Sequence, residues 1–268
     1  MELSIKTIED LSLNAWPSHQ MQVYDGWILR FSHFYTHRTN CVEPIGASIL
    51  PLAEKVAYCE SIYRHWKSPC IFKISPIADP ELDSLLSRRG YHIEHEVNVM
   101  VGSLLEENIR EPARIPGLVL KERVDNEWLD GLFRLKNMAD PVHHRIVPAM
   151  YAAIPMDEIV ACVIRDGKVA ATGLGILDRG YVGIYAIHVA EAYRRQGLAR
   201  GIVSTLLAEG RRHGARLAYL QVVADNAPAK SLYRSLGFCT AYTCYFRVKD
   251  MPESVSGHTV TRNEGVLQ

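Results

Sequence analysis

The sequence predicts an α/β fold with a mixed sheet, built as two tandem copies of one β-α-β-α-β unit. Asp25-Gly26 and Asp166-Gly167 each lie between alternating apolar residues, which is typical of β-hairpins. Helical apolar spacing alternates with short apolar runs along the rest of the chain. The segment from Cys70 to Tyr91 also resembles the one from Leu217 to Phe238, since in both a strand precedes a short helix that ends in Gly-aromatic. A chance similarity between two α/β segments is the alternative explanation.

The elements of the first half follow from apolar spacing and from turn residues. Pro17 stops the first helix, Asp25-Gly26 joins two strands, and Gly90 closes a later helix in the C′ position. The pattern predicts helices over 7–14, 51–67 and 80–89, strands on both sides of Asp25-Gly26, and strands over 70–75 and 91–101.

The second half begins after a stretch rich in proline, glycine and charge, which indicates a linker. Asp125 and Asn226 are suited to cap the helices that follow them, and Gly237 ends the second of these. The pattern predicts strands over 118–124, 159–164, 169–177, 181–189, 217–223 and 239–248, helices over 126–137, 199–213 and 227–236, and a helical or irregular stretch over 141–153. The expected domains are an N-terminal domain over 1–108, a linker over 109–117, a second domain over 118–250 and a flexible tail over 251–268.

Composition narrows the class of protein. The 268 residues are 48% apolar and 22% charged, with a formal net charge of zero, which indicates a packed globular protein. The sequence contains no large basic block, which argues against nucleic acid as the main partner. The N-terminus lacks the pattern of a signal peptide, and no apolar run is long enough to span a bilayer, so no membrane partner is expected.

The cysteines and histidines give no sign of a metal site. The six cysteines are scattered without a C-x-x-C pair, which favours a cytoplasmic protein with reduced, buried thiols. His143 and His144 are the one adjacent histidine pair, and neighbours do not share a face of a helix or strand. We therefore expect no metal.

A glycine-containing turn from Tyr193 to Arg200 lies between a predicted strand and a predicted helix. The first N–H groups of a helix lack partners within the helix, and the helix dipole adds partial positive charge there. Gly197 lets the backbone approach an anion without a Cβ in the way. This turn predicts a phosphate or pyrophosphate site, with an ordinary turn bearing solvated arginines as the alternative.

The second half resembles the GCN5-related N-acetyltransferase (GNAT) superfamily. Arg194-x-x-Gly197-x-Ala199 is similar to the Arg/Gln-x-x-Gly-x-Gly/Ala loop of that superfamily, and Asn226-x-x-Ala229-x-x-x-Tyr233-x-x-x-Gly237-Phe238 is similar to its later helix. The first half resembles the degenerate GNAT-like domain of two-domain bacterial members, in Trp16-Pro17, Asp25-Gly26-Trp27-x-Leu29-Arg30-Phe31 and Tyr35-Thr36-x-Arg38-x-Asn40. The first copy has Leu50 opposite Gly197 and Leu86 opposite Tyr233.

The resemblance implies transfer of an acetyl or other acyl group from acetyl-coenzyme A to an amine. It implies that the backbone around Gly197 binds the pyrophosphate and that Ile187-His188-Val189 receives the pantetheine arm and polarises the thioester carbonyl. Asn226 would contact the pantetheine or cap its helix. Tyr233 would protonate the departing thiolate, the alternative being a tyrosine that only packs in the core. The implied coenzyme A residues are Ile187, His188, Val189, Arg194, Arg195, Gln196, Gly197, Leu198, Ala199, Arg200, Asn226 and Tyr233.

The amine must lose a proton before it attacks, because an ordinary lysine-like amine has a pKa of about 10.4. His188 is the first candidate for the base, since it lies at the strand end beside the thioester. Other candidates are Glu191, His143, His144, Tyr185 and a base acting through water. Candidate contacts to the acceptor are Pro141, His143, Arg145, Met150 and Tyr151 in the second half, and Trp27, Arg30, Tyr35, Arg38 and Asn40 in the first.

Three functions remain open at this stage. The first is an N-acetyltransferase acting on a small-molecule or peptide amine. The second is a non-catalytic acyl-coenzyme A sensor, and the third is an O-acyltransferase on the same scaffold. Two fused copies are compatible with either a monomer or a homodimer.

Overall fold

The computed structural model describes residues 4–105, 112 and 114–251, which form two compact units. Unit 1 comprises Met1–Glu9, Ser18–Val97 and Thr243–Leu267, and unit 2 comprises mainly Asp10–Pro17 and Asn98–Tyr242. Part of the predicted linker and nearly all of the predicted tail lie outside the described residues.

Unit 1 contains a mixed set of strands covered by two helices. The turn Asp25-Gly26 has φ values of 42° and 78°, as a two-residue hairpin of type I′ requires, so the first predicted hairpin is confirmed. The strands follow the order β1-β2-β3-β4-β11, with β3 and β4 parallel. The elements are β1 (Gln20–Tyr24), β2 (Trp27–Phe31), β3 (Val42–Pro44), α2 (Leu52–His65), β4 (Cys70–Ile74), α3 (Pro80–Arg88) and part of β11 (Cys239–Lys249).

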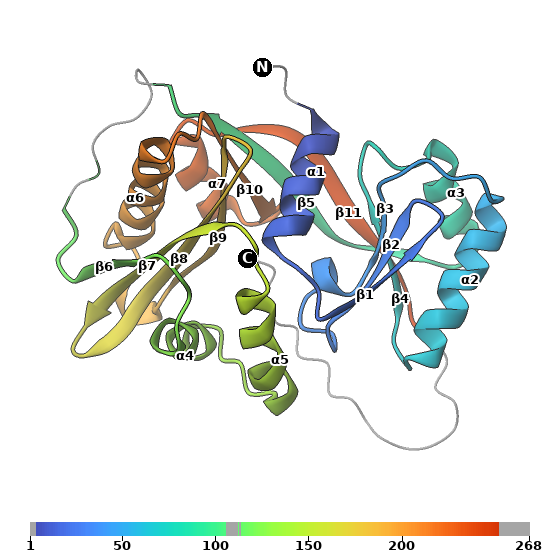
Figure 1. Cartoon of the computed structure of the whole chain (residues 1–268), viewed down its shortest axis with the longest axis horizontal. Helices are drawn as coiled ribbons and strands as arrows, with labels where there is room; N and C mark the ends of the chain where they lie inside the picture. The colour runs from blue at the N-terminus through green and yellow to red at the C-terminus, as the bar shows by residue number, and fades with distance from the viewer. Residues whose placement is uncertain (1–3, 106–111, 113, 252–268) are drawn as a thin grey trace. The chain divides into compact units, whose positions relative to one another are not determined.

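Unit 2 has a longer run of strands, in the order β5-β10-β9-β8-β7-β6. In Figure 1, α6 lies on one side of β7, β8 and β9, and α4 lies on the other side. The elements are part of β5 (His92–Ser103), β6 (Leu118–Lys121), α4 (Asn126–Leu135), α5 (Pro141–Ala152), β7 (Asp157–Arg165), β8 (Lys168–Asp178), β9 (Tyr181–Val189), α6 (Leu198–Arg212), β10 (Leu217–Val223) and α7 (Ala227–Arg234). The remaining helix, α1 (Ile5–Ala15), continues from unit 1 into unit 2.

The predicted elements are close to the observed ones. The turn Asp166-Gly167 has φ values of 49° and 70°, which confirms the second hairpin. A third tight turn, Arg179-Gly180, joins β8 to β9 with φ values of 49° and 78°. The strand predicted over 118–124 is shorter, because it ends at Lys121, and Asp125 then caps α4 through Trp128 N.

The last strand of each half of the sequence is divided between the two compact units. β5 follows α3 in the chain, yet its second half belongs to unit 2, where Met100 and Leu104 join the main apolar core. β11 follows α7, yet its second half belongs to unit 1 and pairs antiparallel with β4. This arrangement differs from a simple division at 109–117, since a segment over 118–250 contains no part of β5.

Candidate active site

The N-terminus of α6 is built differently from most other helix starts. Side chains of Asp79, Asp125, Asp140 and Asn226 cap α3, α4, α5 and α7. The N-cap of α6 is Gly197, with φ of 81° and no side-chain cap. A Cβ at Gly197 would meet no heavy atom within 4 Å. The first N–H groups of the fifteen-residue helix therefore have no side-chain cap, which suits them to an anion.

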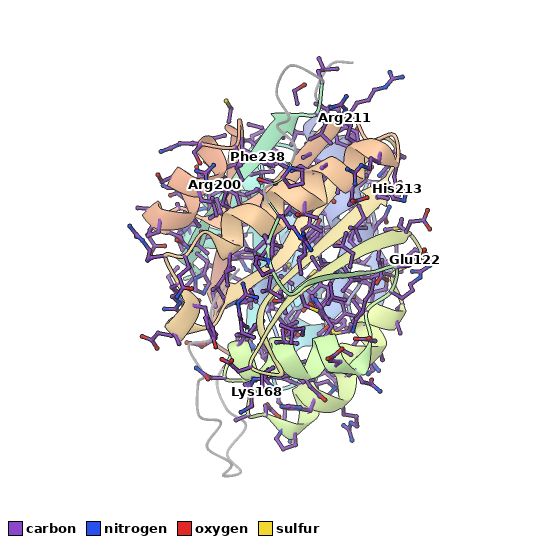
Figure 2. The ribbon with its side chains drawn as sticks, turned by 90° about the vertical axis from the view of Figure 1, so that its left-hand side faces the viewer. Glu122, Lys168, Arg200, Arg211, His213 and Phe238 are labelled. Carbon is purple, nitrogen blue, oxygen red and sulfur yellow. The ribbon has the colours of Figure 1, made fainter. Side chains whose placement is uncertain are left out.

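Several side chains hold the turn before α6 in place. The Tyr193 hydroxyl donates to Oδ2 of Asp166 at 2.7 Å, which ties the turn to the β7–β8 hairpin. Nε of Arg194 donates to the Val189 carbonyl at 3.4 Å. Nη2 of Arg200 donates to Oγ of Ser235 at 2.5 Å, and Figure 2 shows Arg200 near the N-terminal end of α6, with Arg211 at the other end. Two of the three arginines are thus engaged within the protein, and the backbone is the main candidate for holding an anion.

A bulge interrupts β9 beside this turn. The register of β8 and β9 shifts between Thr172 and Leu174, so that β9 carries an extra residue. Ala186 lies there in the left-handed region, with φ of 50°. A bulge leaves a residue unpaired in the ladder, and such bulges often lie next to active sites. Ile187, His188 and Val189, for which the family resemblance implies contact with the thioester, follow Ala186 in the chain.

The parallel strands β9 and β10 pair over only part of their length. Residues Tyr181–Ile184 pair with Leu217–Leu220, and no further pairs follow although β9 continues to Val189 and β10 to Val223. Their facing backbone groups beyond this point are available to an extended ligand, as in recognition by β-strand addition. The hydroxyls of Tyr185 and Tyr219 meet at 2.8 Å near the point where pairing ends.

Asn226 is the N-cap of α7, and Tyr233 lies within that helix. Oδ1 of Asn226 accepts from Ala229 N at 3.1 Å, so the predicted cap is present. The Tyr233 side chain packs in the main core of unit 2 and is 8% exposed. Burial raises the pKa of Tyr233 to about 12, so the phenol stays protonated at neutral pH. Within the described part of the chain, its hydroxyl has no hydrogen-bond partner.

His188 is buried, with 9% of its surface exposed. Burial, with a smaller contribution from Lys136, lowers the pKa of His188 to about 3. The imidazole is therefore neutral at neutral pH, but it accepts a proton only weakly. A general base works best when its pKa lies near the operating pH, so this environment is unfavourable for that role.

The other candidates for the base are scattered. Glu191 is exposed in the turn after β9. Nε2 of His143 lies 3.8 Å from Asp140, and Nε2 of His144 lies 2.8 Å from the Met138 carbonyl oxygen. None of these contacts identifies one of them as the base.

Three of the acceptor candidates in the first half are parts of the framework of unit 1. Trp27 is 2% exposed and packs in the core. Arg30 is buried, and its Nη1 donates to the Arg38 carbonyl at 2.6 Å. Oδ1 of Asn40 accepts from Ser32 N at 2.7 Å. These contacts explain why such polar residues are buried, and they leave Tyr35 and Arg38 as untested candidates.

The first copy places a carboxylate beside the turn that precedes α2. Both oxygens of Asp25 lie 3.1 Å from Ile49 N, and Oδ2 also accepts from Leu50 N at 3.1 Å, just before α2 begins. Lys55 of α2 lies 3.2 Å from the same carboxylate. Desolvation acts to raise the pKa of Asp25, but the hydrogen bonds from these two N–H groups and from Lys55 together outweigh it, so the pKa is lowered. An internal carboxylate thus binds the backbone just before α2, at Leu50, the residue opposite Gly197.

Comparisons with known proteins agree with this geometry. A family model described as "Probable histone acetyltransferase Rv0428c C-terminal" matches residues 3–246. The chain belongs to this family. The uncharacterized N-acetyltransferase YobR of Bacillus subtilis is 24% identical over 251 residues, which is 91% of this chain and 98% of that protein. The family match and these relatives identify an acetyltransferase of the GNAT superfamily.

Two solved structures share the fold of this acetyltransferase. A GCN5-related N-acetyltransferase from Kribbella flavida has a TM-score of 0.67 and 16% identity, and covers 94% of this chain and 98% of that one. A tandem GNAT protein from the clavulanic acid biosynthesis pathway has a TM-score of 0.61 and 14% identity, and covers 80% of this chain and 76% of that one. The predicted GNAT fold is thereby confirmed. Among the described residues, no helix is long and apolar enough to cross a membrane.

Sequence reasoning missed three features of the site. The bulge at Ala186 has no signature, because any small residue is compatible with its position. The Tyr193–Asp166 hydrogen bond joins residues from two different turns, and apolar periodicity says nothing about such pairs. The Asp25 carboxylate at the start of α2 was hidden because Asp25-Gly26 already had an explanation as a hairpin turn.

Proposed function

We propose that this acetyltransferase moves an acetyl group from acetyl-coenzyme A to a primary amine by direct attack of the amine on the thioester. The observation that supports this most is the uncapped N-terminus of α6 at Gly197, beside a bulged strand and an unpaired strand edge. The N–H groups of residues 196–200 would bind the pyrophosphate, and the edge of β9 beyond the bulge would receive the pantetheine arm.

The same residues would carry the chemistry. A backbone N–H near Ile187–Val189 would stabilise the oxyanion that forms when the amine attacks. The C–S bond then breaks, and the Tyr233 hydroxyl would give its proton to the departing thiolate. The amine proton would leave through water, because the low pKa of His188 disfavours that imidazole as the acceptor.

The direct test follows free thiol from acetyl-coenzyme A in the presence of a panel of amines, including lysine-containing peptides and small primary amines. We expect amine-dependent thiol release with at least one acceptor, and an acetylated amine of the matching mass. Tight coenzyme A binding without thiol release from any amine would instead favour the acyl-coenzyme A sensor. Thiol release with alcohols but not amines would favour an O-acyltransferase.

A methyl group at Gly197 tests the pyrophosphate assignment. Because the Cβ of a Gly197→Ala variant would point into open space beside the helix N-terminus, we expect coenzyme A affinity to fall by about tenfold or more, with a stability loss of roughly 1–2 kcal/mol from the positive φ. Isothermal titration calorimetry measures the affinity. Gly214→Ala is the matched control, since Gly214 follows the other end of α6 with φ of 86° and equally open space. Equal affinity in both variants would remove the α6 N-terminus from the binding site.

Replacing His188 tests the base. We expect a His188→Gln variant to lose less than about tenfold in kcat, because a group with a pKa of about 3 contributes little as a base at neutral pH. The measurement is kcat from pH 6 to pH 9 for both proteins. A loss of about 10²-fold or more, with unchanged coenzyme A affinity, would establish His188 as the base after all.

A further inference from the structure

Unit 1 brings two histidines and a glutamate together at one point. The ligand atoms of His37, Glu94 and His95 all lie within 4.8 Å of one another. Nε2 of His37 is 3.1 Å from Oε2 of Glu94, and Nε2 of His95 is 3.8 Å from the same oxygen. Zinc–nitrogen and zinc–oxygen bonds of about 2.0–2.2 Å in a tetrahedron put neighbouring ligand atoms about 3.3–3.5 Å apart. The two separations from Glu94 bracket that value and the two histidine nitrogens lie within 4.8 Å of each other, so one ion could contact all three groups after side-chain shifts.

The backbone at His95 makes this meeting possible. Successive side chains of a strand point to opposite faces of the sheet, so Glu94 and His95 would ordinarily point apart. His95 instead has φ of 51° within β5, which interrupts the strand geometry. A local break of this kind changes the direction in which a side chain points. The left-handed conformation is unfavourable for a residue with a Cβ. The departure brings the His95 imidazole to the carboxylate of its neighbour.

The surroundings hold the three side chains while leaving them open to solution. The His37 ring packs edge-on against Phe246 at a centroid distance of 5.4 Å and against His95 at 4.5 Å. The side chains of His37, Glu94 and His95 are 26%, 33% and 41% exposed. Nε2 of His92 lies 2.7 Å from Oε1 of Glu94, whereas His37 and His95 approach the other oxygen, Oε2. Such an outer partner orients a ligating carboxylate.

We propose that His37, Glu94 and His95 form a binding site for Zn²⁺ or a similar divalent transition metal ion. Two imidazoles and one carboxylate are a donor set that suits zinc, and water would complete the coordination. The site uses none of the residues assigned to acetyl transfer. Sequence spacing does not reveal the site, because His37 and Glu94 are 57 positions apart and the fold brings them together.

Calorimetric titration of the full-length, tag-free, chelator-treated protein with Zn²⁺ tests the proposal. We expect one ion per chain. Loss of an outer partner of a metal ligand typically costs about 10–100-fold in affinity, so we expect that loss for His92→Gln. Loss of a ligand itself should cost more, so His37→Ala and His95→Ala should each lower the affinity by at least about 100-fold. His65→Ala is the control, because His65 is an exposed histidine of the same unit and lies on α2. Circular dichroism of each variant shows whether it is folded.

Cobalt provides a second readout. Co²⁺ bound by two imidazoles and a carboxylate should give a visible absorption band that Zn²⁺ displaces and that is lost in His37→Ala and His95→Ala. The proposal is overturned if the wild-type protein binds no Zn²⁺. It is also overturned if folded His37→Ala and His95→Ala variants bind as tightly as the wild type, which would show adventitious binding by surface histidines.

Discussion

Replacing Tyr233 with phenylalanine is expected to lower kcat by about 10²–10⁴-fold while leaving coenzyme A affinity unchanged, because general acid catalysis typically contributes that much. A thiolate is a poor leaving group in an apolar environment unless it gains a proton. The Tyr233 side chain is buried, and its hydroxyl has no hydrogen-bond partner among residues 4–105, 112 and 114–251, so the proton it carries is not committed elsewhere.

The raised pKa of Tyr233 does not exclude this role. A free thiol has a pKa of about 8.5, and burial raises the pKa of Tyr233 to about 12. The same burial makes a nearby thiolate more basic, since both anions lose hydration. Because the phenol is protonated well below its pKa, Tyr233 should cause no alkaline limb in the pH–rate profile between pH 6 and pH 9.

Single-turnover kinetics and calorimetry with coenzyme A separate the chemical step from binding. Tyr181→Phe is the control, because Tyr181 is a buried tyrosine on β9 at the paired end of that strand. Normal turnover by Tyr233→Phe would exclude Tyr233 from the mechanism. A fall in both kcat and affinity would indicate that the residue is needed to shape the site.

Replacing Lys73 with alanine should destabilise the protein by about 3–5 kcal/mol, the usual cost of leaving buried charges without their partner. Nζ of Lys73 lies 2.5 Å from Glu9 and 3.6 Å from Glu43, and all three side chains are at most 3% exposed. Burial by itself lowers the pKa of Lys73, but the two carboxylates outweigh that effect and raise it, so the ammonium is charged. Its removal takes one positive charge away from two buried carboxylates of unit 1, of which Glu43 keeps Arg30 at 3.7 Å.

Equilibrium unfolding in urea measures this loss. Lys249→Ala is the control, because the Lys249–Glu60 pair at 3.2 Å is partly exposed, and such pairs contribute only about 0–1 kcal/mol. Replacing Glu9 with glutamine in the Lys73→Ala background should recover part of the stability, since the buried carboxylate nearest to the lost ammonium is then replaced by an uncharged amide, while Glu43 keeps Arg30. A loss below about 1 kcal/mol for Lys73→Ala alone would contradict this account of the cluster.

The elements of the fold were largely predictable, because apolar spacing and turn residues act over a few residues. The helix Asn126–Leu135, its Asp125 cap and the strand Tyr181–Val189 follow directly from local pattern. The division of β5 and β11 between the two units was not predictable, because pairing between distant strands leaves no mark in either strand. Local pattern therefore predicts the pieces, and long-range pairing decides which unit each piece completes.

The candidate site also has features that local sequence predicts and features that depend on long-range packing. Gly197 and Asn226 were recognisable because their roles depend on backbone conformation and on the start of a helix. The environment of His188 was not recognisable, since its burial depends on packing that no neighbouring residue reveals. For the same reason, Lys73, Glu9 and Glu43 gave no sign that they form a buried cluster.

The Asp25 carboxylate before α2 behaves as a tethered competitor. Asp25 is only 24 and 25 residues away from Ile49 and Leu50 along the chain, so the effective concentration of its carboxylate at their N–H groups is on the order of millimolar or higher. A phosphate from solution would have to displace this built-in ligand. The backbone before α2 thus receives its carboxylate from the chain itself, whereas the N-cap of α6, Gly197, has no side-chain cap.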